Sequence, residues 1–194
     1  MTDETLRFYN ANAEAYAGDK KSPDPRLFAF LARCKPGGRI LELGTGGGVD
    51  AAAIIGEGFD LDATDGSAEL AAIATRQLGR PVRTMLFEEL DAVAAYDGIY
   101  ACASLTHVAR TELADIIAKI HRALVDGGVV WASFKTGDGE ATDAFERRYN
   151  FLPPEDLMSL WRSAAPWSEL SQDQWLGSAY DRKSTEWLAV TAVK

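Results

Sequence analysis

The sequence predicts an α/β fold built on a doubly wound, mostly parallel sheet. The segment Arg39–Asp65 reads as a short apolar strand, a glycine turn, a small-residue helix and a second strand that ends in an acid. Further apolar runs that suit buried strands alternate with stretches of helical periodicity. With 194 residues, of which 47% are hydrophobic, the chain is long enough for one domain with a full core, and we expect residues 1–194 to form a single domain.

The turn Gly44–Gly48, which follows the first strand, says most about the ligand. It reads Gly-Thr-Gly-Gly-Gly, and glycine permits positive φ angles and a close backbone approach to a ligand. The helix that follows offers free N–H groups at its N-terminus. Asp65, at the tip of the second strand, can accept both hydroxyls of a ribose. These features predict a ligand that contains a nucleoside.

Two common nucleotide motifs do not fit this turn. The dinucleotide fingerprint G-x-G-x-x-G/A would need a small residue at position 49, where the chain has Val49. A P-loop would end in Gly-Lys-Ser/Thr, but the turn continues into Val49-Asp50, and Asp50 would repel a pyrophosphate at the helix start. A ligand with a ribose and a positive charge but no phosphate fits better.

The segment Leu41–Gly48 resembles motif I of the class I S-adenosylmethionine-dependent methyltransferases, (D/E)-x-G-x-G-x-G, and Thr64–Ser67 resembles their second motif. The resemblance spans roughly residues 9–135 and is to small methyltransferases of the ubiquinone-biosynthesis and tellurite-resistance type. It implies a Rossmann-like, seven-stranded, mostly parallel sheet with a C-terminal antiparallel hairpin, and S-adenosyl-L-methionine as the cofactor. The cofactor-binding residues that it implies are Tyr9, Tyr16, Glu42, Gly44, Thr45, Gly46, Gly48, Asp65, Gly66, Ser67, Phe87, Glu88, Ala103 and Ser104.

Residues 1–22 are polar with scattered aromatic side chains. In methyltransferases of this type a tyrosine-containing N-terminal segment closes over the cofactor, and Tyr9 and Tyr16 resemble its residues. The segment is therefore interpreted as an N-terminal arm or lid. The alternative is an arm whose rings only cover the core.

The following elements can be placed from caps and periodicity. Asp24 is a candidate N-cap with Pro25 at the first helical position, and Ser67 is the candidate cap of the helix after the second strand. Residues 81–86 read as the third strand. The resemblance places Phe87 and Glu88 at the adenine; the alternative is an ordinary strand–helix corner.

Residues 96–103 read as the fourth strand. Thr111 is the candidate cap of a helix that ends in Asp126-Gly127-Gly128, as in a glycine C-cap. Three more strands are predicted over residues 129–134, 167–176 and 185–193, and the short polar link between the last two suits a hairpin.

Candidate acceptor residues follow the fourth and fifth strands. His107 lies where the family places groups that face the methyl, so it is the candidate base; a capping or packing role is the alternative. Residues 135–153 are charged and glycine-containing, which suits a substrate-side insertion or a solvated loop. The candidate substrate residues, which favour an anionic acceptor, are His107, Lys135, Arg147, Arg148 and Tyr149.

Composition narrows the partners. A net charge of −9 argues against a basic groove for nucleic acid, although local charge can differ from net charge. Two histidines and two cysteines, Cys34 and Cys102, do not form a metal motif, and we expect both cysteines to be core thiols. No apolar run is long enough for a membrane span, and the first residues lack the apolar core of a signal peptide, so we expect a cytoplasmic protein.

The leading hypothesis is methyl transfer to a small molecule by in-line displacement. Proximity supplies much of the rate, and a base is needed only if the acceptor must lose a proton. The alternatives are a cofactor-binding regulatory protein without turnover and a nicotinamide-dependent oxidoreductase, against which Val49 argues.

Overall fold

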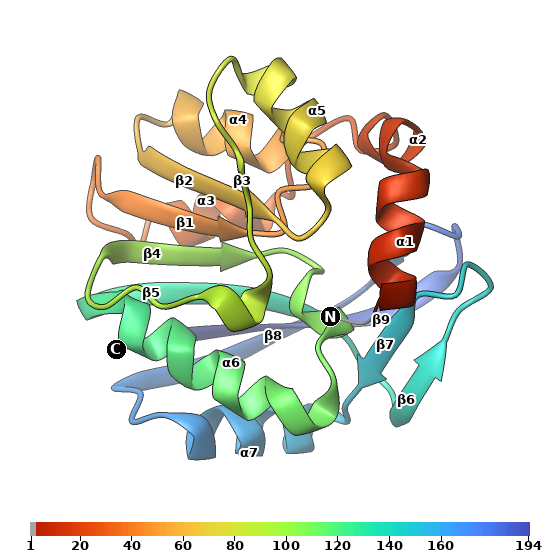
Figure 1. Cartoon of the computed structure of the whole chain (residues 1–194). Helices are drawn as coiled ribbons and strands as arrows, with labels where there is room; N and C mark the ends of the chain where they lie inside the picture. The colour runs from red at the N-terminus through yellow and green to blue at the C-terminus, as the bar shows by residue number, and fades with distance from the viewer. Residues whose placement is uncertain (1–2) are drawn as a thin grey trace.

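The fold is organised around a seven-stranded sheet with the order β3-β2-β1-β4-β5-β9-β8, which confirms the predicted α/β class (Figure 1). A computed structural model describes residues 3–194. Neighbouring strands from β3 to β5 pair in parallel, and β9 and β8 add an antiparallel hairpin at one edge. The strands are β1 (Arg39–Leu43), β2 (Asp60–Asp65), β3 (Arg83–Thr84), β4 (Tyr96–Ala101), β5 (Leu124–Lys135), β8 (Glu169–Ser178) and β9 (Ser184–Val193).

Helices pack on both faces of this sheet because its strand residues alternate between two cores. Ile99 and Ala101 of β4 join the cluster formed with α6 (Arg110–Ala123) and α7 (Pro154–Ala164). Tyr100 points to the other face, where it packs with residues of α3 (Arg26–Leu31) and α4 (Val49–Gly56). Further along, α5 (Ala68–Leu78) contacts β2 and β3.

Two helices and a small hairpin stand at the carboxyl ends of the parallel strands, to the right in Figure 1. The helices are α1 (Asp3–Ala11) and α2 (Ala13–Ala17), so the predicted arm is helical; its residues 1–2 lie outside the described residues. The hairpin is formed by β6 (Gly139–Thr142) and β7 (Arg148–Phe151). Sequence analysis found no periodicity here because each strand has only four residues.

Of the three helix starts predicted from capping residues, the structure confirms one, shifts one and contradicts one. The Ser67 side chain accepts a hydrogen bond from the N–H of Leu70, as predicted. Asp24 accepts from the N–H of Arg26, but α3 begins at Arg26, one residue later than expected. The prediction for Thr111 is wrong, since α6 begins at Arg110 after Ala109 and has no side-chain cap.

Two strand boundaries also differ from the predictions. β3 has only two residues, Arg83 and Thr84, both exposed at the sheet edge and paired with Thr64 and Asp65 of β2. Beyond them, the N–H of Met85 still donates to the carbonyl of Asp65. β5 begins at Leu124, directly after α6, so Gly127 with φ of 76° lies in the irregular start of a strand and is not a C-cap.

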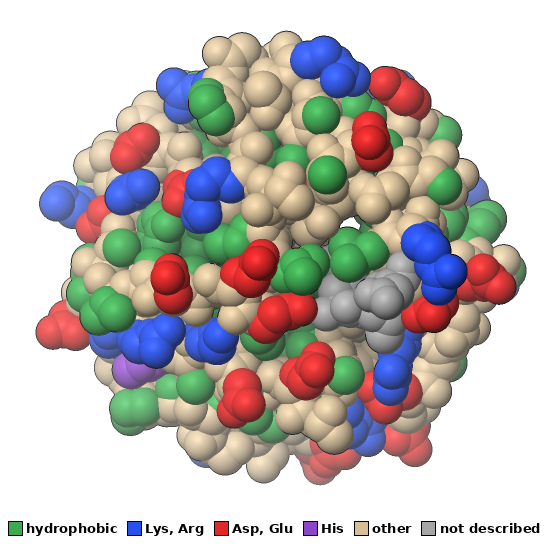
Figure 2. Space-filling view, viewed as in Figure 1, with side chains coloured by type: hydrophobic (Ala, Val, Ile, Leu, Met, Phe, Trp, Pro, Cys, Tyr) green, Lys and Arg blue, Asp and Glu red, His purple; other side chains and the backbone are tan. Residues whose placement is uncertain are grey.

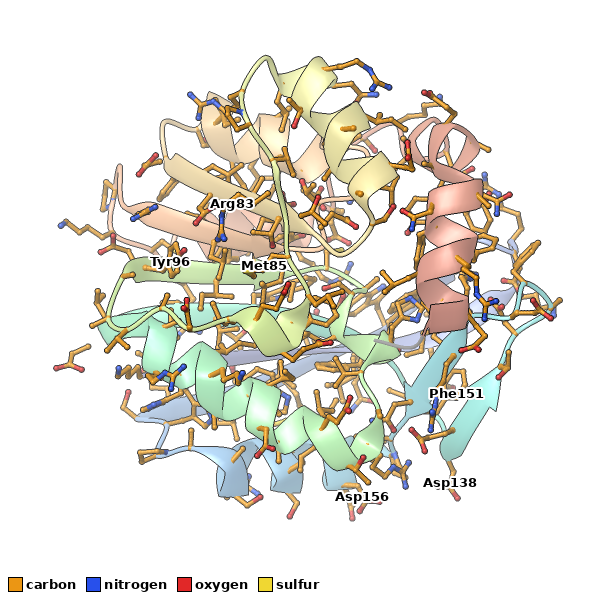
Figure 3. All side chains as sticks on the ribbon, in the orientation of Figure 1. Arg83, Met85, Tyr96, Asp138, Phe151 and Asp156 are labelled. Atoms are coloured by element: carbon orange, nitrogen blue, oxygen red, sulfur yellow. The ribbon has the colours of Figure 1, made fainter. Side chains whose placement is uncertain are left out.

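A polar network ties three strands together away from the predicted ligand edge. The Asp62 carboxylate accepts from the Arg83 guanidinium at 2.9 and 3.0 Å and from the Tyr96 hydroxyl at 2.6 Å. In Figure 3, Tyr96 lies at the start of β4 on the left, whereas Phe151 of the small hairpin lies on the right. This network therefore stabilises the sheet and does not take part in the ligand edge, at the carboxyl ends of the parallel strands.

Candidate functional site

Two adjoining cavities lie at the carboxyl ends of β1, β2 and β4, where doubly wound sheets bind ligands. The larger has a volume of about 340 Å³ and the smaller about 50 Å³. They share part of their wall, contributed by Tyr9, Tyr16, Gly44, Gly46, Cys102, Ala103 and His107. The two cavities therefore lie side by side around the same residues.

The glycine turn forms the floor between β1 and α4. The N–H groups of Gly44 and Thr45 both donate to the carbonyl of Thr64 at 2.9 Å, which holds the turn against β2. Gly44 has φ of 85°, and a Cβ there would lie 2.6 Å from Cβ of Ser104. Only glycine therefore fits this position, and its backbone is left open to the cavity.

Asp65 is buried at the tip of β2 and lines the smaller cavity. Its two carboxylate oxygens accept from the N–H groups of Gly46 and Ser67, each at 2.8 Å. Burial raises the pKa of Asp65 to about 6. Each oxygen keeps a second lone pair, so the carboxylate suits two neighbouring hydroxyl donors, as on a ribose.

Glu42 lies beneath the turn and lines neither cavity. Its carboxylate accepts from the Thr45 hydroxyl at 2.5 Å, and burial raises its pKa to about 8. Gly48 also lies outside both cavities, because its α-carbon faces Ala74 and Leu78 of α5.

Of the two cofactor residues predicted at the tip of β3, Phe87 and Glu88, only Phe87 lines a cavity. Phe87 is buried and lines the smaller cavity with Gly66, Ser67 and Ser104. Glu88 lines neither cavity, and its carbonyl accepts from the Lys119 ammonium.

His107 lines both cavities, and both of its ring nitrogens are hydrogen-bonded within the protein. Nδ1 lies 2.7 Å from the carbonyl oxygen of Arg148, and Nε2 lies 2.8 Å from the Tyr9 hydroxyl. A carbonyl can only accept, so Nδ1 carries the proton and Nε2 accepts the proton of Tyr9. Burial lowers the pKa of His107 to about 4, which keeps the ring neutral.

Lys135 reaches the larger cavity between aromatic rings. Its ammonium lies 3.8 Å from the ring centre of Tyr149 and 5.8 Å from that of Trp187. Among residues 3–194, no hydrogen bond or ion pair is formed by this ammonium. Burial and the nearby Arg147 lower the pKa of Lys135 to about 8.

The two predicted arginines have different surroundings: Arg147 is the last residue of the turn before β7, and Arg148 is the first residue of that strand. Arg147 is buried, lines the larger cavity and forms an ion pair with Asp143 at 2.6 Å. The Arg148 guanidinium lies outside both cavities and pairs with Glu140 at 3.0 Å, so Arg148 contributes only its backbone to the site.

Several cavity residues were missed by sequence analysis. Lys20 pairs with Asp50 at 2.5 Å, and Asp19 pairs with Arg182 from the β8–β9 link. Asp50 had a signal, because it lies in the first turn of α4, but Lys20 and residues 179–183 are far from any motif. The missed residues include Asp19, Lys20, Asp50, Cys102, Tyr180, Arg182 and Trp187.

The cysteine prediction was half right. Cys34 is a buried core thiol, whereas Cys102 lines both cavities. Burial raises the pKa of Cys102 to about 12, so it stays a thiol. Within residues 3–194 there is no cluster of three or more His, Cys, Asp or Glu residues placed to hold a metal ion.

A sequence model of the family described as "Methyltransferase domain" matches residues 13–188. The chain belongs to this family. With motif I and Asp65 around the smaller cavity, it is a class I S-adenosyl-L-methionine-dependent methyltransferase. This assignment leaves the oxidoreductase alternative without support. A search of curated proteins finds no match.

Solved structures support the fold of this methyltransferase. A Burkholderia thailandensis 1,6-didemethyltoxoflavin-N1-methyltransferase, with 1,6-didemethyltoxoflavin and S-adenosylhomocysteine bound, is 24% identical with a TM-score of 0.68, covering 95% of this chain and 79% of that one. A Methanosarcina mazei S-adenosylmethionine-dependent methyltransferase is 14% identical with a TM-score of 0.75, covering 90% and 99%.

A third structure is the Haemonchus contortus phosphoethanolamine N-methyltransferase 2 with phosphomonomethylethanolamine and S-adenosylhomocysteine. It is 18% identical with a TM-score of 0.78, covering 99% of this chain. This chain spans only 59% of that enzyme's length.

The charged side chains on the surface of the methyltransferase are of both signs, as its acidic composition leads one to expect. Figure 2 shows lysine and arginine side chains interspersed with aspartate and glutamate on the visible face, with no continuous basic area there for nucleic acid. No helix within residues 3–194 is long and apolar enough to span a membrane.

Proposed function

We propose that the enzyme methylates a small anionic molecule bound in the larger cavity. The observation that carries this proposal is the ammonium of Lys135, which enters the cavity without a counter-ion among residues 3–194. A half-buried cation without a counter-ion is unfavourable, so an anionic group on the acceptor would compensate for it.

The smaller cavity and its shared wall would hold the cofactor. The Gly44–Gly46 turn gives backbone room, Asp65 accepts the ribose hydroxyls, and Phe87 covers the adenine. Bound there, S-adenosylmethionine supplies an electrophilic methyl group on a positively charged sulfur. We assign the other predicted cofactor residues to the same site, with Glu42 and Gly48 supporting the turn and Glu88 contributing its backbone.

The charges of the larger cavity favour an anion over an amine. Its acids are already neutralised, Asp50 by Lys20 and Asp19 by Arg182. Asp143, next to the cavity, is bound to Arg147. No carboxylate of the lining within residues 3–194 is left to bind a cation, whereas Lys135 is free to bind an anion.

His107 acts through Tyr9 when the acceptor must lose a proton. Tyr9 lines the cavity, and its oxygen would take the acceptor's proton while its own proton passes to Nε2 of His107. The Arg148 carbonyl, 2.7 Å from Nδ1, stabilises the imidazolium that results. His107 alone has no ring nitrogen directed at the acceptor.

The finer assignments follow from this arrangement. Residues 1–22 form the lid, since Tyr9, Tyr16 and Lys20 line the cavities, and residues 135–153 form the substrate-side insertion within a single domain. The small ubiquinone-biosynthesis or tellurite-resistance type, which comes from the motif resemblance, is proposed as the subtype.

A panel of acceptors tests the proposal. We expect S-adenosylhomocysteine, and not NAD, to raise the melting temperature. S-adenosylhomocysteine formation should then be higher with phenols, carboxylates and phosphate monoesters than with amines of similar size. The panel includes phosphate monoesters because one structural neighbour binds phosphomonomethylethanolamine. Turnover confined to cationic amines would refute the proposal that the acceptor is anionic. If the protein binds no cofactor, the proposed methyltransferase function fails.

A further inference from the structure

The Arg147 guanidinium is surrounded by aromatic rings from three separate segments. Its central carbon lies 4.8 Å from the ring centre of Phe8, 5.2 Å from Tyr180 and 5.5 Å from Phe145. Tyr149 and Tyr9 lie at 5.4 and 5.8 Å. The segments are helix α1, the β6–β7 hairpin and the β8–β9 link.

The Arg147 side chain is buried, and its hydrogen bonds go to protein groups. Only 2% of its side chain is exposed. Its Nε and Nη2 both donate to Oδ2 of Asp143, at 3.0 and 2.6 Å, and Nη1 lies 3.4 Å from the Tyr9 hydroxyl. A buried guanidinium with one counter-ion depends on the rings around it, because cation–π contacts replace part of its lost hydration.

Helix α1 supplies two of these rings and also reaches the cofactor cavity. Phe8 and Tyr9 contact Arg147, and the next residue, Asn10, accepts a hydrogen bond from the Ser67 hydroxyl at 2.7 Å. The N–H of Ser67 binds Asp65, the proposed ribose ligand. One turn of α1 therefore joins the buried arginine to the ribose end of the cofactor cavity.

Opening of α1 would remove Phe8 and Tyr9 from the guanidinium while Asp143, Phe145 and Tyr149 stay on the hairpin. Arg147 would then keep its counter-ion but lose part of its cation–π shell. The closed position of α1 is consequently favoured by a residue that lies 138 positions away in sequence and belongs to the acceptor-side hairpin.

We propose that Arg147 is a positioning residue that holds α1 closed over the cofactor, so that release of S-adenosylhomocysteine is controlled from the acceptor-side hairpin. The proposal rests on the cofactor site of the proposed function. It adds that the hairpin, which contacts the acceptor, also sets how long the cofactor stays bound.

Dissociation of S-adenosylhomocysteine from immobilised enzyme, followed by surface plasmon resonance, tests it. Arg147→Met keeps the length of the side chain but removes its charge, and we expect dissociation at least about tenfold faster. Arg147→Lys keeps the charge and should give an intermediate rate. Arg33→Met is the matched control: the side chain of Arg33 is 40% exposed, pairs with Glu169 and lies outside both cavities, so the rate should stay that of the wild type.

A second measurement separates positioning from general stability. In Arg147→Met, hydrogen–deuterium exchange should become faster in residues 3–17 and stay unchanged in β1 and β4. Phe8→Leu, which removes a ring from the lid side, should also speed dissociation, and the two changes together should be less than multiplicative.

Two results would overturn the inference: a wild-type dissociation rate in Arg147→Met, or faster exchange throughout the sheet. If the wild-type enzyme does not bind S-adenosylhomocysteine at all, it is the proposed function that fails.

Discussion

The Tyr9 hydroxyl lies 2.8 Å from Nε2 of His107, although 98 positions separate these residues in the chain. Tyr9 comes from the N-terminal helix and His107 from the loop after β4, so the pair exists only when α1 is closed. Since the Arg148 carbonyl fixes the proton on Nδ1, the direction of the Tyr9 hydrogen bond is set as well.

Tyr9→Phe should lower turnover by about 10²-fold or more with an acceptor that must lose a proton. The substitution removes the hydroxyl that bonds to His107 but keeps the ring, which packs edge-on against Tyr16 at 4.9 Å. The loss of turnover should exceed the loss of affinity for S-adenosylhomocysteine, which calorimetry measures, because the ring that lines the cofactor cavity is kept. Equal turnover in the variant and the wild type would exclude Tyr9 from proton transfer.

Stability should depend on pH through His107. Its pKa is about 4 in the folded enzyme and about 6.5 when unfolded, so below pH 6.5 the unfolded state binds the extra proton first. The stability due to the neutral ring is fully present above pH 6.5 and is lost as pH falls towards 4. Denaturant titrations at several pH values give the free energy of unfolding. Between pH 6.5 and 4 this free energy should fall more steeply in the wild type than in His107→Gln, and an equal dependence on pH in both would contradict the prediction.

Asp65→Asn should weaken binding of S-adenosylhomocysteine by at least about tenfold, because charge-assisted hydrogen bonds to the ribose are lost. In the wild type, affinity should fall as pH drops through about 6, the pKa of Asp65, since protonation removes the charge. Asp60→Asn is the control, because Asp60 lies on the same strand with its side chain 69% exposed. Calorimetry at pH 5 and pH 8 measures both effects.

Lys135→Met should raise KM for an anionic acceptor about tenfold or more and leave cofactor affinity unchanged. It should also raise the melting temperature, because a half-buried ammonium without a counter-ion is replaced by an apolar side chain. In the wild type, KM should rise as pH increases above about 8, where Lys135 loses its proton. Lys35→Met, at an exposed side chain outside both cavities, should change neither quantity.

Gly47→Ala should weaken cofactor binding by about tenfold without unfolding the enzyme. A Cβ at Gly47 would lie 2.8 Å from the carbonyl oxygen of Ala17 and 2.9 Å from its Cα, so α2 must move off the glycine turn. Gly56→Ala, where a Cβ meets nothing within 4 Å, is the control. If both variants bind S-adenosylhomocysteine equally well, α2 is not part of the cofactor enclosure.

The parallel sheet and the cofactor side were predictable because their signals are local. A strand, a glycine turn and an acid lie within residues 39–65, and the positive φ angles of Gly44, Gly46 and Gly48 explain why these positions are glycine. The cap at Ser67 is local too. β3 was predicted too long because apolar character continues beyond the two residues that pair with β2.

The acceptor side was only partly predictable because its contacts are long-range. Lys135, Arg147, Tyr149 and His107 were found from their position after the strands, and all four line the larger cavity. Which of the two adjacent arginines is buried depends on where the β6–β7 turn ends and on the bonds of Arg147 to Asp143, which sequence does not reveal. Tyr180 and Arg182 reach the cavity only because the β8–β9 hairpin folds back beside α2.

The cofactor and the acceptor are served by different parts of the chain, and this separation affects how such enzymes change substrate. Apart from Lys135 at the end of β5 and His107 after β4, the walls that would face the acceptor come from α1, the β6–β7 hairpin and the β8–β9 link. None of these three segments belongs to the five parallel strands. Mutations in these three segments can reshape acceptor choice while the glycine turn and Asp65 stay intact. Exchange of the hairpin alone is therefore a short evolutionary route, and an engineering route, to a new acceptor.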